Sequence, residues 1–185
     1  MQDIDKLSIE EYLKVVGFEP EDVAMILEYG VNEIDKESLH EKIKYLISLG
    51  LDPRRIRIVI EEDITFVTEE ISLIVNNGTF LKSIMSSEEL IDCLEVTPEL
   101  LTVKEGYLKE NLGLLKLIIK EDEVLKMLLL DRAELLTYKP KFLSEKLSYL
   151  IENGLKDKLV KILIEEIEIF DLDNDEIDLE YLKKM

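Results

Sequence analysis

LHEKIKYLISLGL at residues 39–51 and LSEKLSYLIENGL at residues 143–155 are two versions of one phrase. Leu, Glu-Lys, an aliphatic residue, Tyr-Leu-Ile, Gly and Leu recur in register in both segments. The two segments start 104 residues apart. That separation is three steps of roughly 35 residues, and a recurring period of about 20–50 residues is typical of repeat proteins. The pair therefore predicts a chain built from repeated helical units.

Two fainter copies lie between these segments. TEEISLIVNNG at residues 68–78 and LKENLGLLKLII at residues 108–119 align with the phrase through their aliphatic residues. Successive copies are then separated by 28, 41 and 35 residues. We attribute the long step to an insertion around residues 79–95, because added residues in a loop between helices cost little closure entropy.

Glycine and proline mark helix ends along the chain. Residues 17–20 and 50–53 share the layout Gly-x-x-Pro. Glycine accepts the left-handed conformation beyond a helix end, and proline fits the first helical turn, so each layout predicts one helix ending and the next beginning. IRIVI at residues 56–60 and ITFV at residues 64–67 are rich in β-branched residues. Their position within the repeats favours helix over strand.

Capping motifs support the same interpretation. The pattern of Ser, Thr or Asp followed three residues later by Glu occurs at residues 8–11, 86–89, 102–105 and 173–176. This pattern predicts the reciprocal side-chain caps of helix N-termini. VLKMLLL at residues 124–130 is apolar almost all round, which predicts a helix at the centre of the stack.

These observations predict an all-α fold, specifically a curved α-helical repeat (solenoid) of about four to five two- or three-helix units. No single unit could bury its apolar face alone, so stacked neighbours would share one core within a single domain, 1–185. The predicted units are 8–50, 51–78, 79–121, 122–154 and 155–185.

The charge is strongly acidic and unevenly spread. The 185 residues contain 42 acidic and 23 basic side chains, for a net charge of −19. Such a balance disfavours a generic binder of phosphate backbones or anionic membranes. Residues 1–38 carry eleven acids and three bases, whereas residues 103–164 carry ten acids and twelve bases. The middle of the chain is therefore slightly positive.

Other features of composition favour a cytoplasmic protein without a membrane partner. The single cysteine excludes an internal disulfide and suits a reducing compartment. No apolar run approaches the ~18 residues that a membrane helix needs. The first residues read MQDIDKLSIEEYL, which resembles neither a secretory signal nor a transit peptide.

TPELL at residues 97–101 precedes the long apolar segment 108–119, and AELLTYKP at residues 133–140 precedes 143–155. This arrangement resembles the repeat of the mitochondrial transcription termination factor family, and the resemblance covers most of residues 8–170. It implies a superhelix of three-helix repeats. It also implies nucleic-acid binding along a basic concave face, which many family members show, and no set of catalytic residues.

No motif predicts an enzyme, a cofactor or a metal. His40 is the only histidine and cannot build a zinc site or a catalytic triad alone, so we expect a solvated surface residue. Cys93 has apolar neighbours, which favours a buried small side chain. DLDNDE at residues 171–176 begins like a calcium loop, but positions six and twelve are Glu176 and Leu182 rather than Gly and Glu. We interpret this segment as the cap of a last helix.

Basic residues are the candidate partner contacts. They are Arg54, Arg55, Arg57, Lys104, Lys109, Lys139 and Lys141. Arginine suits bidentate contacts to carboxylates or phosphates. Lys104 and Lys139 lie one repeat apart, so we expect them to stack in a basic stripe along one edge.

We therefore hypothesise a non-enzymatic helical-repeat binding module, a protein–protein interaction module or regulatory adaptor. Its acidic ends would steer the approach of a protein partner. The alternative is a nucleic-acid-binding protein that uses a basic groove in residues 103–164. The sequence leaves the oligomeric state open.

Overall fold

The computed structural model describes residues 7–30 and 35–185. Within these ranges the chain forms α-helices and short 3-10 helices, and no strand. The predicted all-α repeat fold is thus confirmed. The chain divides into two compact units, one ending at Glu105 and the other beginning at Gly106, and each unit is described by itself.

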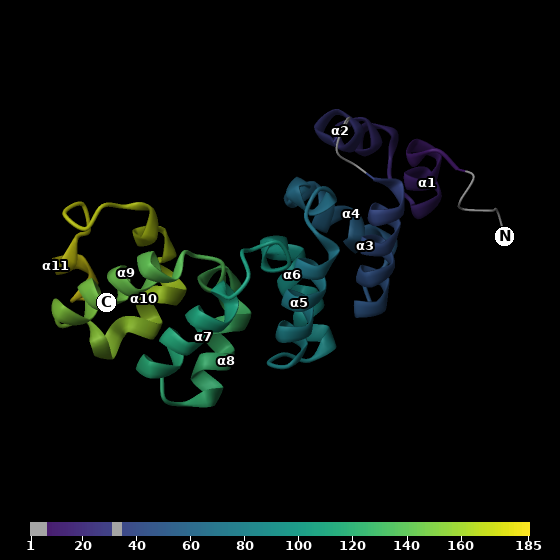
Figure 1. Cartoon of the computed structure of the whole chain (residues 1–185). Helices are drawn as coiled ribbons and strands as arrows, with labels where there is room; N and C mark the ends of the chain where they lie inside the picture. The colour runs from purple at the N-terminus through teal and green to yellow at the C-terminus, as the bar shows by residue number, and fades with distance from the viewer. Residues whose placement is uncertain (1–6, 31–34) are drawn as a thin grey trace. The chain divides into compact units, whose positions relative to one another are not determined.

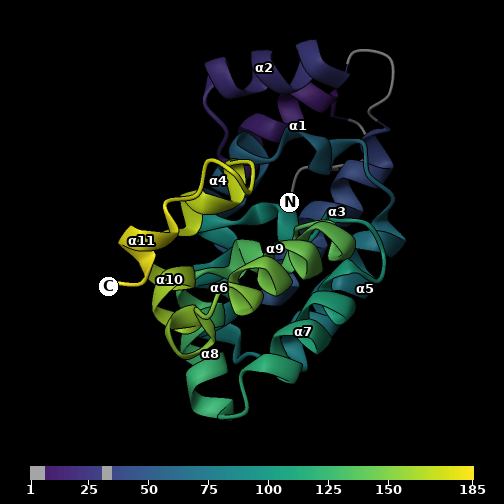
Figure 2. The same ribbon diagram turned by 90° about the vertical axis from the view of Figure 1, so that its left-hand side faces the viewer.

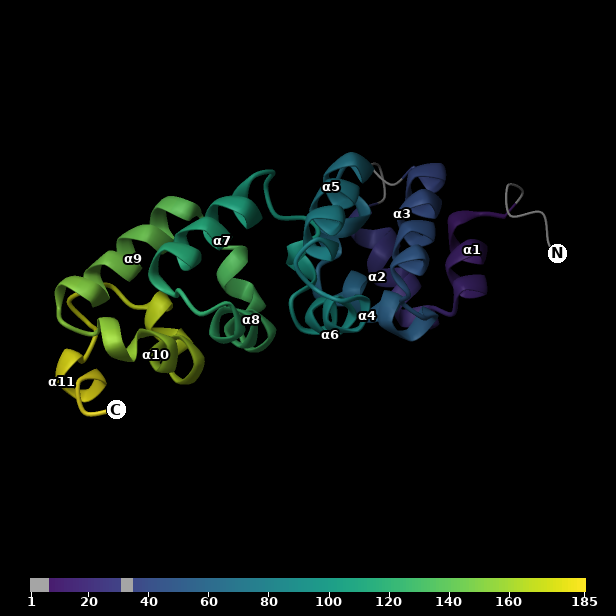
Figure 3. The same ribbon diagram turned by 90° about the horizontal axis from the view of Figure 1, so that it is seen from below.

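The first unit contains six α-helices among its described residues (Figure 1). They are α1 (Ile9–Val16), α2 (Pro20–Gly30), α3 (Lys36–Leu49), α4 (Pro53–Glu62), α5 (Ile71–Lys82) and α6 (Ser87–Val96), with the 3-10 helices η2 (Ile64–Val67) and η3 (Pro98–Leu100). α1 packs against α2 (Figure 2). α3 packs along α5, and α4 packs along α6 (Figure 3).

The second unit repeats this arrangement. Its elements are α7 (Tyr107–Ile118), α8 (Asp122–Asp131), η4 (Ala133–Leu136), α9 (Pro140–Glu152), η5 (Lys156–Lys158), α10 (Leu159–Glu165), η6 (Ile167–Asp171) and α11 (Leu179–Leu182). The long helices α7 and α9 pack side by side, and α8 packs against α10 (Figure 3). Four stretches of the chain therefore share one order, which we call a triad: a long helix, a second helix and a 3-10 helix. The four triads are α3–α4–η2, α5–α6–η3, α7–α8–η4 and α9–α10–η6.

Local sequence signals determine where these elements begin and end. All four prolines open helices, at the first residues of α2, α4, η3 and α9. Gly17 and Gly50 close α1 and α3 at φ 108° and 103°, a left-handed conformation that glycine adopts without strain. The runs IRIVI and ITFV lie in α4 and η2, as predicted.

Two of the four predicted capping boxes form. Ser8 caps α1 and Ser86 caps α6, each reciprocally with the glutamate three residues later. The other two predictions are wrong. The hydroxyl of Thr102 donates to the Asp63 carboxylate instead of capping a helix, and the last helix, α11, is capped by Asp178.

The second helix of the third triad is less buried than predicted. Met127 and Leu130 of α8 are 49% and 40% exposed. The buried side of α8 consists of Leu125, Leu128 and Leu129. The run at residues 124–130 therefore has one buried side and one exposed side, although most of its residues are apolar.

The predicted register of the second copy is wrong. α5 runs through the predicted boundary between residues 78 and 79, and the expected insertion at 79–95 is the end of α5 with most of α6. Gly78 aligns with the helix-ending Gly50 in the predicted repeat, but it lies buried within α5. A Cβ atom at Gly78 would lie 2.2 Å from the Tyr45 hydroxyl of α3, so the glycine permits a close approach between helices.

Candidate binding surface

One buried polar side chain in each long helix ties that helix to the 3-10 helix of its own triad. These side chains are Lys42, Asn77, Asn111 and Lys146. Each donates to backbone carbonyl oxygens at or just beyond the end of the 3-10 helix, 24–27 residues along the chain. The four positions are spaced 35, 34 and 35 residues apart, which corrects the predicted steps of 28, 41 and 35.

The geometry of these contacts leaves little freedom for the long helix. The Nδ2 atom of Asn111 lies 2.9 Å from the carbonyl oxygen of Leu136 and 2.7 Å from that of Tyr138. The Nζ atom of Lys42 lies 2.7 Å from the carbonyl oxygen of Val67, and burial lowers the pKa of this amine. Each contact satisfies a carbonyl group at a helix end that would otherwise lack a donor.

Two tyrosines show that the outer triads are equivalent. Tyr45 on α3 and Tyr149 on α9 are both half-buried. The hydroxyl of Tyr45 donates to the carbonyl oxygen of Val75 at 3.4 Å, and that of Tyr149 donates to the carbonyl oxygen of Asn174 at 2.7 Å. Each tyrosine therefore reaches the segment that follows its own triad, as repeat equivalence requires.

Two of the predicted arginine contacts are engaged within the first unit. The Nε atom of Arg55 lies 2.5 Å from a carboxylate oxygen of Glu95 on α6. Arg57 faces Asp22 of α2 at 3.8 Å and Glu61 of α4 at 3.3 Å. Both guanidinium groups thus join helices of the same unit rather than forming an open anion site.

The remaining predicted basic residues lie on the surface. Arg54 is exposed at the start of α4. The lysines on the surface are Lys104, Lys109, Lys139 and Lys141. Lys104 belongs to the first unit and the other three to the second. The stacking of Lys104 and Lys139 stays a prediction, because the two residues belong to different units.

An open apolar groove lies between α7 and α9, and the sequence reasoning missed it. Its volume is about 520 Å³, and we call it the α7–α9 groove. Its lining residues are Glu110, Gly113, Leu114, Leu117, Pro140 and Ser144. Leu117 is 69% exposed, and a Cβ atom at Gly113 would meet nothing within 4 Å. The residues on α7 follow the spacing of one helical face, which is the signal that could have revealed the groove.

The lysines of the second unit lie on the same two helices as the groove. Lys109 and Lys116 are exposed on α7, and Lys141 is exposed on α9. The Nζ atom of Lys141 lies 3.7 Å from a carboxylate oxygen of Glu145, one helical turn away. Both partners are largely exposed, so water screens this ion pair and makes it weak. Lys141 can therefore still attract a negatively charged partner.

The acidic segment that follows η6, residues 172–176, is held in place by α9. The Nζ atom of Lys146 lies 2.6 Å from the carbonyl oxygen of Leu172, and Tyr149 reaches Asn174. A smaller depression of about 310 Å³ lies beside this segment and is lined by Phe142, Lys146 and the acidic side chains. Across the described parts of the chain, no group of three or more His, Cys, Asp or Glu side chains could hold a metal ion.

His40 and Cys93 both pack against other residues of the first unit. The Nδ1 atom of His40 lies 2.7 Å from the Tyr12 hydroxyl, and the two rings meet edge to face. His40 is thus half-buried and less solvated than expected for a surface residue, because Tyr12 of α1 covers one side of it. Burial raises the pKa of Tyr12 to about 12. Cys93 is buried, as predicted.

Comparison with known proteins shows the family. Where the structure describes them, the helices are too short or too polar to cross a membrane. No curated protein matches the sequence. The sequence model of the mTERF (mitochondrial transcription termination factor) family matches residues 6–172, which is most of the 185 residues. The match and the repeated triads together show that the chain belongs to the mTERF family.

Proposed function

We propose that this chain is a non-enzymatic binding module that recognises a protein partner on the face formed by α7 and α9. The observation that carries the proposal is the α7–α9 groove, where Leu117 stays 69% exposed beside the open space at Gly113. When a partner covers such an apolar side chain, the complex is stabilised by about 25 cal/mol per Å² of buried apolar surface. The polar contacts of Asn111 and Lys146 hold the two helices in place before binding.

The distribution of charge favours a protein over a nucleic acid as the partner. Arginine is well suited to phosphate contacts, but Arg55 and Arg57 already face carboxylates. The chain as a whole carries a net charge of −19, which repels a polyanion. The groove itself offers apolar surface, which a phosphate backbone cannot use.

Nucleic-acid binding through residues 103–164 is the second candidate function. It is supported by membership of the mTERF family, in which such binding is common, and by the exposed lysines on α7 and α9. A mobility-shift titration at two salt concentrations tests it, because contacts to phosphates make the affinity fall steeply with salt. Salt-dependent binding that Lys116→Glu abolishes and Leu117→Asp leaves unchanged would replace the protein proposal with this one.

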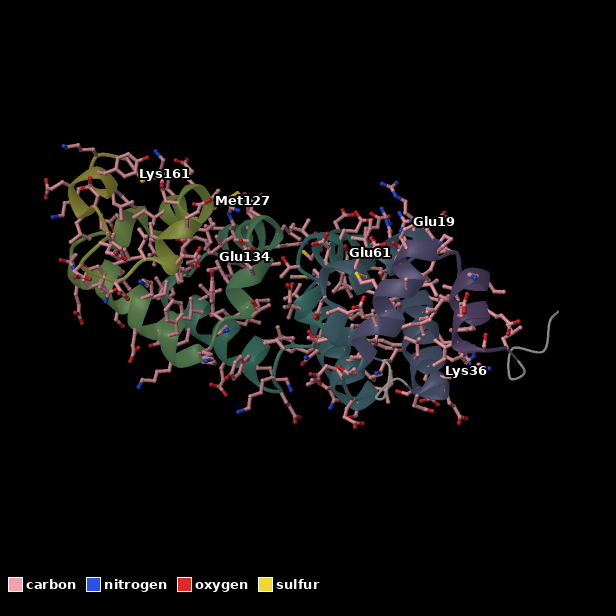
Figure 4. The ribbon with its side chains drawn as sticks, turned by 90° about the horizontal axis from the view of Figure 1, so that it is seen from above. Glu19, Lys36, Glu61, Met127, Glu134 and Lys161 are labelled. Atoms are coloured by element: carbon pink, nitrogen blue, oxygen red, sulfur yellow. The ribbon has the colours of Figure 1, made fainter. Side chains whose placement is uncertain are left out.

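The direct test of the protein proposal is affinity capture with matched variants. Leu117→Asp places a charge in the groove, and Met127→Asp places one on α8. Figure 4 shows Met127 on the same side of the second unit as Lys161 of α10. Both replaced side chains are exposed, so neither variant should unfold the chain. We expect Leu117→Asp to lose a protein that the wild type and Met127→Asp retain. Equal capture by all three proteins would refute the proposal.

A further inference from the structure

We propose that the occupant of the α7–α9 groove is an acidic amphipathic helix of the partner protein. This inference rests on the proposed function and names the chemistry of the partner. It depends on three features of the second unit: the helical spacing of the groove lining, the space at Gly113, and the basic residues on the two helices that form the walls.

The shape of the groove fits a helix lying along it. Glu110, Gly113, Leu114 and Leu117 form a row at i, i+3, i+4 and i+7 on α7, and Pro140 and Ser144 lie one turn apart on α9. Both sets of residues line one open groove. A helix that docks in a groove inserts apolar anchors at i, i+3, i+4 and i+7. The missing side chain at Gly113 leaves room for one anchor at the centre of the row.

The apolar character of the lining decides against a polar occupant. Leu114, Leu117 and Pro140 give the groove an apolar surface. Covering this surface with other apolar groups is favourable because it removes the surface from water. A nucleic-acid backbone or an extended polar segment would leave Leu117 in water. An amphipathic helix covers Leu117 and keeps its own polar face solvated.

The charge around the groove determines which amphipathic helix fits. The exposed basic residues of α7, α9 and the residue before α9 are Lys109, Lys116, Lys139 and Lys141. The exposed acidic residues of the same two helices are Glu110, Glu145 and Glu152, three carboxylates against these four lysines. The walls are thus net positive in a chain whose net charge is −19. Complementary charge on a partner guides its approach and selects it against competitors, so glutamate or aspartate should flank the apolar anchors of the docked helix.

The test uses a pair of synthetic peptides on the full chain. One peptide of about 18 residues, roughly 27 Å as a helix, carries leucines at i, i+3, i+4 and i+7 and glutamates at the flanking positions. Its twin carries lysine in place of every glutamate. Fluorescence anisotropy at physiological salt measures both affinities. We expect the acidic peptide to bind at least about tenfold more tightly than its twin, a difference of about 1.4 kcal/mol.

Variants of the chain locate the binding. Leu117→Asp should weaken the acidic peptide at least about tenfold, while Met127→Asp should leave its affinity unchanged. The double variant Lys116→Glu with Lys141→Glu should reverse the preference between the two peptides. Equal affinity of the twins for the wild type, or binding that Leu117→Asp does not weaken, would overturn the inference.

Two further outcomes separate this inference from the proposed function. If neither peptide binds but protein capture from the source cell still depends on Leu117, the inference fails and the proposed function stands. If capture does not depend on Leu117, the proposed function fails as well. Sedimentation that shows a dimer lost in Leu117→Asp would identify a second copy of the chain as the occupant and would also overturn the inference.

Discussion

Replacement of Asn77 by leucine tests whether the buried polar contacts hold the triads together. The Nδ2 atom of Asn77 lies 3.0 Å from the carbonyl oxygen of Leu101 and 2.8 Å from that of Val103. Leucine has a similar volume but no donor, so both carbonyl groups lose their partner. A buried unsatisfied acceptor costs about 1–3 kcal/mol. Leu101 is fully buried, whereas Val103 is half-exposed and its carbonyl group can recover a bond to water.

The expected loss is therefore about 2–3 kcal/mol in the free energy of unfolding. For a chain of this size that loss corresponds to a decrease of about 4–12 °C in Tm. Asn76→Leu is the matched control, because Asn76 is the exposed neighbour on the same helix. Exposed substitutions usually change stability by less than about 0.5 kcal/mol.

Urea unfolding followed by circular dichroism measures the difference between the two variants. Hydrogen exchange adds local resolution, since repeat proteins need not unfold in one step. We expect the amides of Leu101 and Thr102, which bond within the η3 turn, to lose protection in Asn77→Leu alone. The reasoning is refuted if the two variants differ by less than about 0.5 kcal/mol, or if protection of these amides is unchanged.

The remaining predictions concern single contacts. Gly78→Ala should destabilise the chain by about 1 kcal/mol or more, because the new methyl group displaces the Tyr45 hydroxyl. Adding Tyr45→Phe should recover part of this loss, and a double-mutant cycle by urea unfolding that shows no coupling would contradict the contact. Burial, the hydrogen bond to Asp22 and the charge of Asp22 raise the pKa of Glu61. The folded state therefore binds the Glu61 proton more tightly than the unfolded state. The free energy of unfolding consequently decreases as the pH rises above 4.5, the ordinary pKa of this carboxyl group. Glu61→Gln should consequently be more stable than the wild type at pH 7.5, by less than about 1 kcal/mol, and its advantage should shrink at pH 5. An advantage that is equal at both pH values would show that Glu61 does not titrate as described.

Local signals explain why much of the fold could be predicted. Pro53 and Gly50 affect the backbone only within a turn of themselves, so their meaning can be read without knowing the rest of the structure. Gly78 is also a glycine, but it is needed for a different reason. Its partner Tyr45 lies on a different helix, so no local rule separates a glycine that ends a helix from one that admits a neighbour.

The candidate site was harder to predict for the same reason. Residue type alone makes Arg55 and Arg57 candidate contacts, but Glu95 and Asp22, which engage them, come from other helices. The α7–α9 groove exists only because two helices lie side by side. One signal was available in the sequence: Asn111 interrupts the apolar stripe of its helix, and Asn77 stands 34 residues earlier in the same place. Buried polar residues at a constant spacing identify the register more reliably than aliphatic residues, which are abundant everywhere in this chain.

Site-specific photo-crosslinking tests the central claim most directly. A photoreactive amino acid is placed at position 117 in the groove, or at position 127 on α8 as the control, and the full chain is irradiated inside the source cell. The account predicts one reproducible protein adduct at position 117, joined through an acidic helical peptide, and no such adduct at position 127. Adducts to nucleic acid at position 117, or the same proteins at both positions, would contradict it.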